Sequence, residues 1–423
     1  MIIILSVGTV IRLVFAPFTT ANYDVSFWMS TIMWMESGDS VYSGGPFWYP
    51  PTFGYILAFD AAVLDLFNIP VQGELFLPIG DHDFSVSYAF ITNPAFNLVI
   101  KLPMILADAV VAVAVYLIAV RITNDQRKGL IAASVWFFCP LVIWMSSIHG
   151  QFDCIAVMFM ALSVLLVMKK RYFLCGVLFG LSVVTKVLPI VIAPLMMAYI
   201  LSNDKGRGGK NALTASAGFL IAVLAIYLPV IMTGEISDSF LFLTRRVDTA
   251  ANISVDRFVN VNWSNILYFS PVIVLVSLLA SLRMYRRKKN RDMEFVILGT
   301  VCTAVLLIFP FTAPSTQYAL LVFPLAAPLC SVDRITRIAR AALAAVYTVS
   351  VAAWATLGIF YPLAMYTPLI DPNALHGFVN DAFDAFVMVG SITSFFMFVP
   401  VVILVVAVYR TFIRKKEGEH EPA

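Results

Sequence analysis

The chain has 423 residues, of which 61% are hydrophobic and only 13% are charged, and its mean hydropathy is +0.89. Soluble proteins carry about 25% charged residues, so this composition excludes a soluble globular protein. The net charge of +3 identifies no partner, because the positions of the charges matter more than their sum, and we expect no nucleic-acid partner.

Apolar stretches recur from end to end, and many approach the roughly 20 residues that a helix needs to cross a hydrocarbon core. They predict an all-α fold, a single integral membrane domain of residues 1–423 with about twelve transmembrane helices. The first stretch is expected to be a retained span rather than a secretory signal, because it lacks a basic leader and Arg12 interrupts it. The predicted spans are 2–19, 96–120, 129–147, 153–168, 172–187, 188–201, 211–233, 264–282, 294–311, 317–331, 340–361 and 387–409.

The charged loops predict a topology for these spans. Threading the chain from a cytoplasmic N-terminus places every strongly basic loop, and the tail 410–423, on the cytoplasmic side, as the positive-inside rule requires. The segments 20–95, 234–263, 312–316 and 362–386 then face outward. The basic loops are Arg121 to Lys128, Lys169 to Arg171, Lys205 to Lys210, Arg283 to Arg291 and Arg334 to Arg340.

The first outward segment, 20–95, contains eight acidic residues and no lysine or arginine. Residues 52–67 are apolar enough to form a span, but a span here would turn the basic loops outward, so we expect a surface or re-entrant helix. A second surface helix is predicted from an apolar face at helical spacing. That face consists of Val25, Trp28, Met29, Ile32 and Met35.

Asp24 follows the first predicted span by a few residues and stands beside Tyr23. One interpretation is the N-cap of the surface helix, a role that stabilises a helix by about 1 kcal/mol. The other is a carboxylate held at the outer membrane boundary as a general base. The spacing alone leaves both open.

Charges at membrane depth cost a few kcal/mol and therefore mark sites or ion pairs. Asp108 lies within the second predicted span, two turns from Lys101, and Lys186 lies near the outer end of the fifth. A structural ion pair between Asp108 and one of these lysines is one interpretation. The other places the Lys186 ammonium at the outer leaflet, where it could hold a lipid phosphate.

The segment IHGQFD, residues 148–153, falls where the third predicted span reaches the outer side. Gly150 is a good helix terminator and Asp153 a plausible N-cap for the next helix, so a capped turn is one interpretation. Yet other polar groups are predicted at the same depth, which favours an active site at the membrane boundary. These groups are Asp24, Lys186, Arg245, Arg246, Asn262, Trp263, Thr316 and Gln317.

Arg245 and Arg246 form a dibasic pair on the predicted outer side, against the positive-inside trend. A surface salt bridge with Asp248 or Glu235 would explain them. A clamp on a phosphate or pyrophosphate would also explain the pair, because a guanidinium group binds two phosphate oxygens at once in a bidentate geometry.

Several of these segments resemble the polyprenyl-phosphate-sugar-dependent glycosyltransferases of the GT-C fold. YDVSFWMSTIMWMESGDSVYSGGPFWYPPTFGYILAF, residues 23–59, is similar to the first external loop of the dolichyl-phosphate-glucose glucosyltransferases, which has an acidic residue, a helix and a YPP turn, here at Tyr49. IHGQFDCIAV is similar to a DHGHFQYN-like segment of that group. TKVLPIVIAP and TAPSTQYALLVFPLAAP resemble the KIYP and TSQY segments of the glycosylphosphatidylinositol mannosyltransferase. The resemblance runs from about residue 20 to residue 330.

The resemblance implies a hexosyltransferase that takes mannose or glucose from a polyprenyl-phosphate donor and passes it to a glycan or lipid acceptor on the extracytoplasmic side. It implies Asp24 as the general base of an inverting displacement. Cationic groups would stabilise the leaving phosphate. Four are candidates for this: Lys186, Arg245, Arg246 and His149. The candidates for lining the donor or acceptor pocket are Tyr23, Tyr49, Asp108, Gln151, Asp153, Trp263 and Gln317.

The sequence departs from the family pattern at two positions. Asp24 is followed by Val25 and Ser26 rather than by a second acid, so we expect no required metal ion or other cofactor. Thr316-Gln317-Tyr318 stands where many relatives carry a His-Glu pair. The five cysteines are isolated and lack metal-ligand spacing.

Two other classes of function stay open at this point: a flippase or transporter of lipid-linked sugars, and a non-catalytic subunit of a glycosylation complex. Many transporters are built from two repeats of inverted topology, and the sequence shows no such repeat. Compact loops and the absence of appended domains favour a prokaryotic cell membrane, with the site facing outside.

Overall fold

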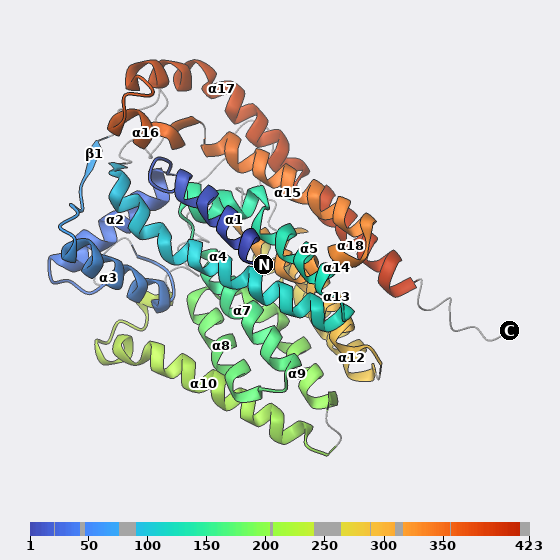
Figure 1. Ribbon diagram of the computed structural model, residues 1–423. Coiled ribbons are helices and arrows are strands. Elements are labelled where there is room, and N and C mark those ends of the chain that lie inside the picture. The colour runs from blue at the N-terminus through green and yellow to red at the C-terminus, as the bar shows by residue number, and fades with distance from the viewer. Residues whose placement is uncertain are drawn as a thin grey trace.

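The computed structural model describes residues 1–20, 22–42, 47–75, 90–203, 206–240, 264–287, 289–308, 316–355 and 357–414. Within them the chain is helical apart from one two-stranded sheet, and the helices lie side by side in one bundle (Figure 1). The predicted all-α fold is confirmed.

Helix α4 (Pro94–Thr123) runs through the middle of the bundle. The Asn93 side chain caps its first turn by accepting a hydrogen bond from the Phe96 N–H, and Asn124 ends it in the left-handed conformation. Four further helices pack with it around the largest apolar core: α5 (Gln126–Phe137), α7 (Asp153–Met168), α13 (Arg291–Ile308) and α14 (Ala319–Val332).

Helices α8 (Tyr172–Thr185) and α10 (Gly208–Met232) approach each other closely. A Cβ on Gly176 would lie 1.9 Å from the Ala215 carbonyl oxygen, so glycine is required there for the two backbones to meet. Tight helix pairs of this kind are typical of membrane proteins, where small residues at the contact allow the helices to pack without a hydrophobic driving force.

The remaining elements complete the bundle and its ends. In chain order they are α1 (Ile2–Phe15), α2 (Asn22–Glu36), α3 (Pro51–Leu66), β1 (Gly73–Leu75), β2 (Phe90–Thr92), α6 (Pro140–Ile143), the π-helix η1 (Trp144–His149), η2 (Leu188–Ile192), α9 (Ala193–Asn203), η3 (Asp238–Phe240), α12 (Ser264–Arg286), η4 (Thr316–Tyr318), α15 (Arg334–Ala355), η5 (Leu357–Phe360), α16 (Tyr361–Tyr366), α17 (Pro372–Phe396), α18 (Phe398–Val408) and η6 (Tyr409–Arg414).

By length and apolar composition, four helical stretches of the described part can cross a membrane, and they are α4, α10, α15 and the continuous stretch Pro372–Ile413. A fifth is possible if α5 and the bent segment Pro140–His149 count as one span. Other apolar helices are shorter, such as α1 with 14 residues, which rises only about 21 Å against a hydrocarbon core of about 30 Å. A multi-pass membrane protein is therefore supported, whereas the predicted number of twelve spans is not confirmed.

Two predicted boundaries differ from the structure. Residues 129–147, expected as one span, bend by 50° where Pro140 starts α6, because proline donates no backbone hydrogen bond and interrupts the helical ladder. The segment 362–386, expected as a polar outer loop, is mostly helix. The Asp371 side chain accepts a hydrogen bond from the Asn373 N–H and Pro372 occupies the first turn, a combination that starts α17 early.

The predicted helices of segment 20–95 are present as α2 and α3, which lie together with β1 at one end of the bundle (Figure 1). A short antiparallel sheet, which the sequence did not predict, pairs Gly73 with Thr92. The apolar face of α2 does not lie on the membrane surface as expected. Val25, Trp28 and Ile32 are buried in a cluster of the protein's own apolar residues.

Candidate active site

The centre of the site is a contact between Asp24 on α2 and His149 at the end of η1. The Nε2–H of His149 donates to Asp24 Oδ2, across 125 residues of sequence. Gly150 ends η1 with φ +81, as expected of a helix terminator, and turns the chain so that His149 faces α2. The two side chains keep 16% and 18% of their surface exposed, so a substrate can reach them. Asp24 lies inside the first turn of α2 and is not its N-cap, so that interpretation is wrong.

Gln151 and Lys186 complete the surroundings of Asp24. Burial by itself raises the pKa of the Asp24 carboxyl, but His149, the Gln151 side-chain hydrogen bond and the charge of Lys186 together hold that pKa below its ordinary value of 3.8. The carboxylate is therefore ionised at neutral pH. Among the described residues, Gln151 Oε1 and His149 Nδ1 are buried without a hydrogen-bond partner. Buried polar atoms without a partner are rare in proteins and are expected where a ligand or water completes the site.

Lys186 and Asp153 form a buried ion pair beside this centre, with 2.7 Å between Nζ and the carboxylate. Phe152 is the N-cap of α7 and Asp153 its first residue, so the prediction of Asp153 as N-cap is wrong. A carboxylate in the first turn still gains from the helix dipole, and here it also fixes the ammonium. The extended conformation of Lys186 at the end of α8 directs its side chain to this position.

Aromatic rings surround the Lys186 ammonium. Its Nζ lies 5.2 Å from the ring centroids of Phe152 and Tyr318 and 5.8 Å from that of Tyr49. Rings at this distance attract an ammonium group through their electron-rich faces and help to fix its position. Tyr49, predicted from the YPP turn, therefore lies in the site. Gln317 lies in η4, directly before Tyr318, and is partly buried.

Four aromatic residues of the site were not among the site residues predicted from the sequence, and they are Trp28, Phe53, Phe152 and Tyr318. Phe53 and Phe152 stack with 4.2 Å between their centroids, and Trp28 packs edge-on against both. For Phe152 and Phe53 their position in the sequence could have indicated the site. Phe152 lies inside HGQFD itself, and Phe53 follows YPP by two residues.

Trp28 and Lys101 also connect the segments that carry the site. The Trp28 indole Nε1–H donates to the Gly150 carbonyl at 3.0 Å. Trp28 lies one turn of α2 after Asp24, and Gly150 directly follows His149. The buried Lys101 ammonium donates to the carbonyls of Ala16 (3.0 Å), Ile148 (3.2 Å) and Thr19. Lys101 thus joins the chain just after α1, which leads into α2, to the end of η1.

Asp108 does not form the predicted ion pair with Lys101 or Lys186, so that interpretation is wrong. Its partner is Arg12 on α1, with 2.9 Å between Nε and Oδ2, and neither side chain is exposed. Arg12 also donates to the Gly8 and Phe137 carbonyls at 3.1 and 2.9 Å. The pair connects α1, α4 and α5. The visible signal was Arg12 itself, a charge within an apolar stretch.

Four predicted site positions are not placed by the structure. Arg245, Arg246 and Trp263 lie outside the described residues, and of Tyr23 only the backbone, in α2, is described. Within the described residues, no three His, Cys, Asp or Glu side chains are grouped as metal ligands.

The sequence model of glycosyltransferase family 87 matches residues 87–310, more than half of the chain. GPI mannosyltransferase 1 of Saccharomyces cerevisiae is 27% identical over 115 residues, which are 26% of this chain and 28% of that protein. The protein of the same description from Candida albicans is 27% identical over 147 residues, 32% of this chain and 37% of the other. The matched stretches therefore span well under half of the length of these relatives.

A solved structure resembles the fold over almost the whole chain. ArnT from Cupriavidus metallidurans, crystallised with undecaprenyl phosphate, matches with a TM-score of 0.50 and 12% sequence identity, covering 99% of this chain and 78% of that one. At this identity the similarity concerns the fold alone.

Proposed function

Because the chain belongs to glycosyltransferase family 87, we propose that it is a membrane glycosyltransferase that transfers a hexose, mannose or glucose, from a polyprenyl-phosphate donor to a glycan or lipid acceptor. The similarity to GPI mannosyltransferase 1 supports a mannosyl donor. The fold shared with a protein crystallised with undecaprenyl phosphate supports a polyprenyl carrier.

One observation carries this proposal: Asp24 is an ionised, accessible carboxylate held by His149 and Gln151 next to the cationic Lys186. A general base must be deprotonated, fixed in direction and reachable by the substrate, and Asp24 meets the three requirements. His149 is less suited to be the base, because its Nδ1 is buried and its Nε2 is engaged by Asp24. We therefore assign His149 the orientation of Asp24 rather than the binding of the donor phosphate.

In the proposed reaction the Asp24 carboxylate accepts the proton of an acceptor hydroxyl. The hydroxyl oxygen forms a bond to the anomeric carbon of the donor as the bond from that carbon to the phosphate oxygen breaks. The sugar inverts its configuration, and the polyprenyl phosphate leaves as a phosphate monoester. Because a phosphate is a good leaving group, stabilising its negative charge matters more than protonating it.

Lys186 is the cation that the geometry offers for the leaving phosphate. Asp153 and the three rings fix its ammonium near Asp24, and the charge of Lys186 lowers the pKa of Asp24. A preorganised cation stabilises the transition state without reorganising during the reaction. Arg245 and Arg246 stay proposed as further phosphate ligands, with Tyr23, Tyr49, Gln151, Trp263 and Gln317 as contacts of the sugar or acceptor.

The site lies at the end of the bundle that carries the acidic segment, which the distribution of charge predicts to face away from the cytoplasm. A donor in that leaflet could place its phosphate at headgroup level beside Lys186 while its polyprenyl chain stays among the lipids. We propose that transfer takes place on this side.

The test is transfer of labelled mannose or glucose from the corresponding polyprenyl phosphate by purified protein. Asp24→Asn should lower the rate by about 10²- to 10⁴-fold, the usual contribution of general-base catalysis, without changing thermal stability markedly. Asp39→Asn is the matched control, because Asp39 is an exposed carboxylate in the same segment. Full activity of Asp24→Asn would remove the mechanism. EDTA should leave the wild-type rate unchanged.

The other two classes of function give different results in the same preparation. A flippase would move the lipid-linked sugar across proteoliposomes without any transfer. A non-catalytic subunit would need a second chain for activity and would tolerate Asp24→Asn.

A further inference from the structure

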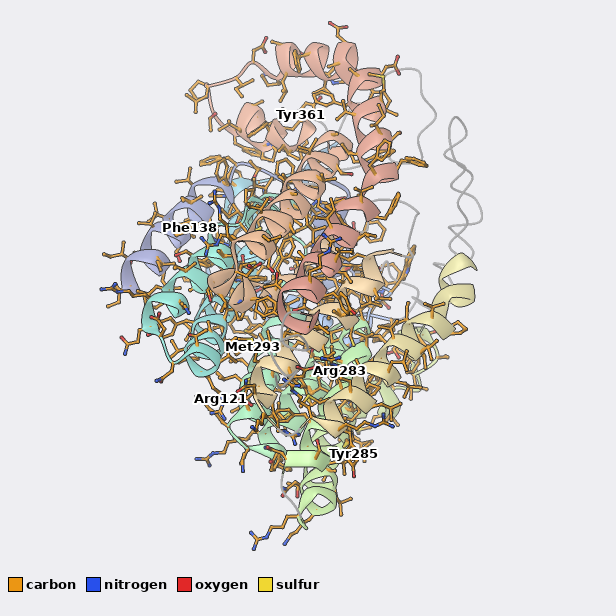
Figure 2. All side chains as sticks on the ribbon, turned by 90° about the vertical axis from the view of Figure 1, so that its right-hand side faces the viewer. Arg121, Phe138, Arg283, Tyr285, Met293 and Tyr361 are labelled. Carbon is orange, nitrogen blue, oxygen red and sulfur yellow. The ribbon has the colours of Figure 1, made fainter. Side chains whose placement is uncertain are left out.

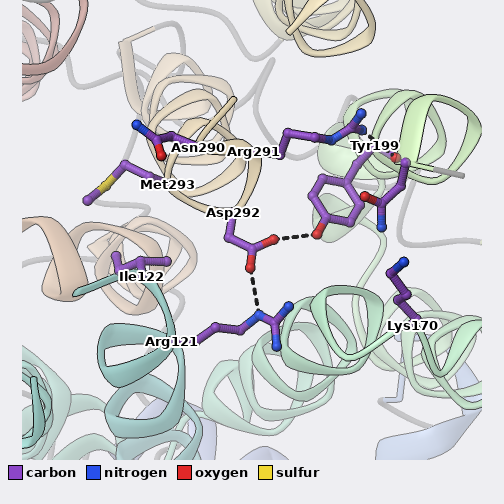
Figure 3. Close-up of a pocket in the computed structure, with 9 residues that line it drawn as sticks. Arg121, Ile122, Lys170, Tyr199, Asn290, Arg291, Asp292 and Met293 are labelled. Carbon is purple, nitrogen blue, oxygen red and sulfur yellow. Dashed lines mark hydrogen bonds and ion pairs between the residues drawn. The ribbon is translucent and has the colours of Figure 1, made fainter. Parts of the chain in front are cut away.

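A polar cavity of about 500 Å³ lies at the other end of the bundle, far from Asp24. Its walls come from four places in the chain: the end of α4, the turn between α7 and α8, the end of α9 and the start of α13 (Figure 3). Arg121 in this wall is twenty residues along α4 from Lys101, a rise of about 30 Å and thus about the thickness of a hydrocarbon core. Figure 2 faces this end, with Arg121, Met293 and Arg283 in its lower half.

The lining of the cavity is predominantly cationic. Arg121, Lys170 and Arg291 contribute three positive charges, whereas Asp292 contributes one negative charge. These residues belong to three separate loops that the sequence predicts on the cytoplasmic side. Their meeting in one cavity agrees with that threading.

The acidic residue is already engaged. Asp292 accepts hydrogen bonds from Arg121 Nε at 2.6 Å and from the Tyr199 hydroxyl. Arg291 belongs to the wall. Its Nη2 donates to the Tyr199 carbonyl and the Ser202 hydroxyl at 2.8 and 2.6 Å, and its guanidinium carbon lies 5.2 Å from the centroid of the Tyr199 ring. The Asp292 carboxylate therefore offsets one of the three positive charges through its ion pair with Arg121, and the lining keeps a net positive charge.

Arg121 and Lys170 face the cavity from its two sides (Figure 3). Arg121 donates from its Nε to Asp292, and its terminal Nη groups have no hydrogen-bond partner among the described residues. Its side chain is 38% exposed, so an anion can reach these groups. Asn203 and Asn290 add amides to the lining. A guanidinium fork, an ammonium and amide donors are the groups that bind phosphate oxygens in proteins.

We propose that this cavity binds a phosphate-bearing anion at the headgroup level of the leaflet opposite the candidate active site. Two sources share this chemistry: the headgroup of an anionic phospholipid, and a soluble phosphate compound. Basic pockets between transmembrane helices suit lipid headgroups, because the surface potential of an anionic leaflet adds to the local attraction. A bound anion would join α4, the turn between α7 and α8, α9 and α13 at one point, so the bound protein is expected to be more stable than the free protein.

Lys170→Asn tests the proposal without disturbing the bundle. Lys170 is exposed and has φ +58, a left-handed conformation that asparagine adopts more readily than lysine. Lys169→Asn is the matched control, because Lys169 is the exposed neighbour, carries the same charge and does not line the cavity. Arg121→Gln is a second test variant, since it removes the fork from the other side.

Two probes distinguish the sources. Native mass spectrometry of protein taken from phosphatidylcholine nanodiscs that contain phosphatidylglycerol measures retained anionic lipid, and calorimetry with inorganic phosphate measures soluble anion. Loss of one charge-assisted hydrogen bond should weaken binding by about tenfold, or about 1.4 kcal/mol.

Weaker retention of phosphatidylglycerol in Lys170→Asn and Arg121→Gln, but not in Lys169→Asn, would assign a lipid headgroup. Weaker binding of inorganic phosphate with unchanged lipid retention would assign a soluble phosphate. Equal effects of Lys169→Asn and Lys170→Asn on both probes, or no effect on either, would overturn the proposal.

Discussion

Trp28→Phe should lower the rate of sugar transfer more than its effect on stability explains. The substitution keeps an aromatic ring beside Phe53 and Phe152 and removes the indole N–H that donates to the Gly150 carbonyl at 3.0 Å. Since Trp28 is only 1% exposed, that carbonyl loses its partner in a site with little access to water. Leaving a buried acceptor without a partner costs about 1–3 kcal/mol of unfolding free energy.

The effect on the rate follows from where this hydrogen bond lies. It joins the turn of α2 after Asp24 to the residue after His149, so its loss allows the segments that carry Asp24 and His149 to move relative to each other. A displacement of about 1 Å in a catalytic group can cost about 10²-fold in rate. We therefore expect the kcat of Trp28→Phe to fall by about 10- to 100-fold, with a smaller change in KM.

Trp136→Phe is a closely matched control. The Trp136 indole also donates to a backbone carbonyl at 3.0 Å, that of Asp108, and Trp136 is fully buried. Both variants should lose similar stability in thermal unfolding in detergent, whereas only Trp28→Phe should lose rate in the transfer assay. Equal kcat values for the two variants would refute the assignment of Trp28 as a positioning residue.

The buried pair of Arg12 and Asp108 should behave as a unit in unfolding measurements. Arg12→Met or Asp108→Leu alone leaves an uncompensated buried charge and should lower the free energy of unfolding by about 3–5 kcal/mol. The double variant should recover most of this loss. A double variant that loses as much as the two single variants together would contradict the coupling. Asp60 should make stability depend on pH. Burial raises its pKa to about 8, whereas the carboxyl of the unfolded chain has a pKa near 3.8. Because the unfolded state gives up this proton first, the free energy of unfolding falls as the pH rises from about 3.8 to about 8 and stays low above that. Asp60→Asn should match the wild type in acid and exceed its melting temperature in alkali, and identical pH profiles would show that the Asp60 carboxyl does not titrate in this way.

The sequence by itself determined the class of the protein and predicted where its candidate site lies. Few charges and repeated apolar stretches leave a helical membrane bundle as the stable solution, because the backbone must satisfy its hydrogen bonds internally in lipid. The bias of basic residues toward alternate loops placed Asp24, His149 and Lys186 at one depth, and the structure brings the three together. Depth can be predicted because hydropathy and charge act locally along each helix.

Only the tertiary structure decided which groups are partners. Asp108 binds Arg12 rather than Lys101 or Lys186, and Lys186 binds Asp153. A buried charge pairs with whichever opposite charge the helix packing brings within reach, and the sequence specifies burial without specifying the rotation and crossing of helices far apart in the chain. Lys101 illustrates this, because three backbone carbonyls, fixed by how α1 and η1 end, bind its ammonium in place of the carboxylate two turns away on its own helix.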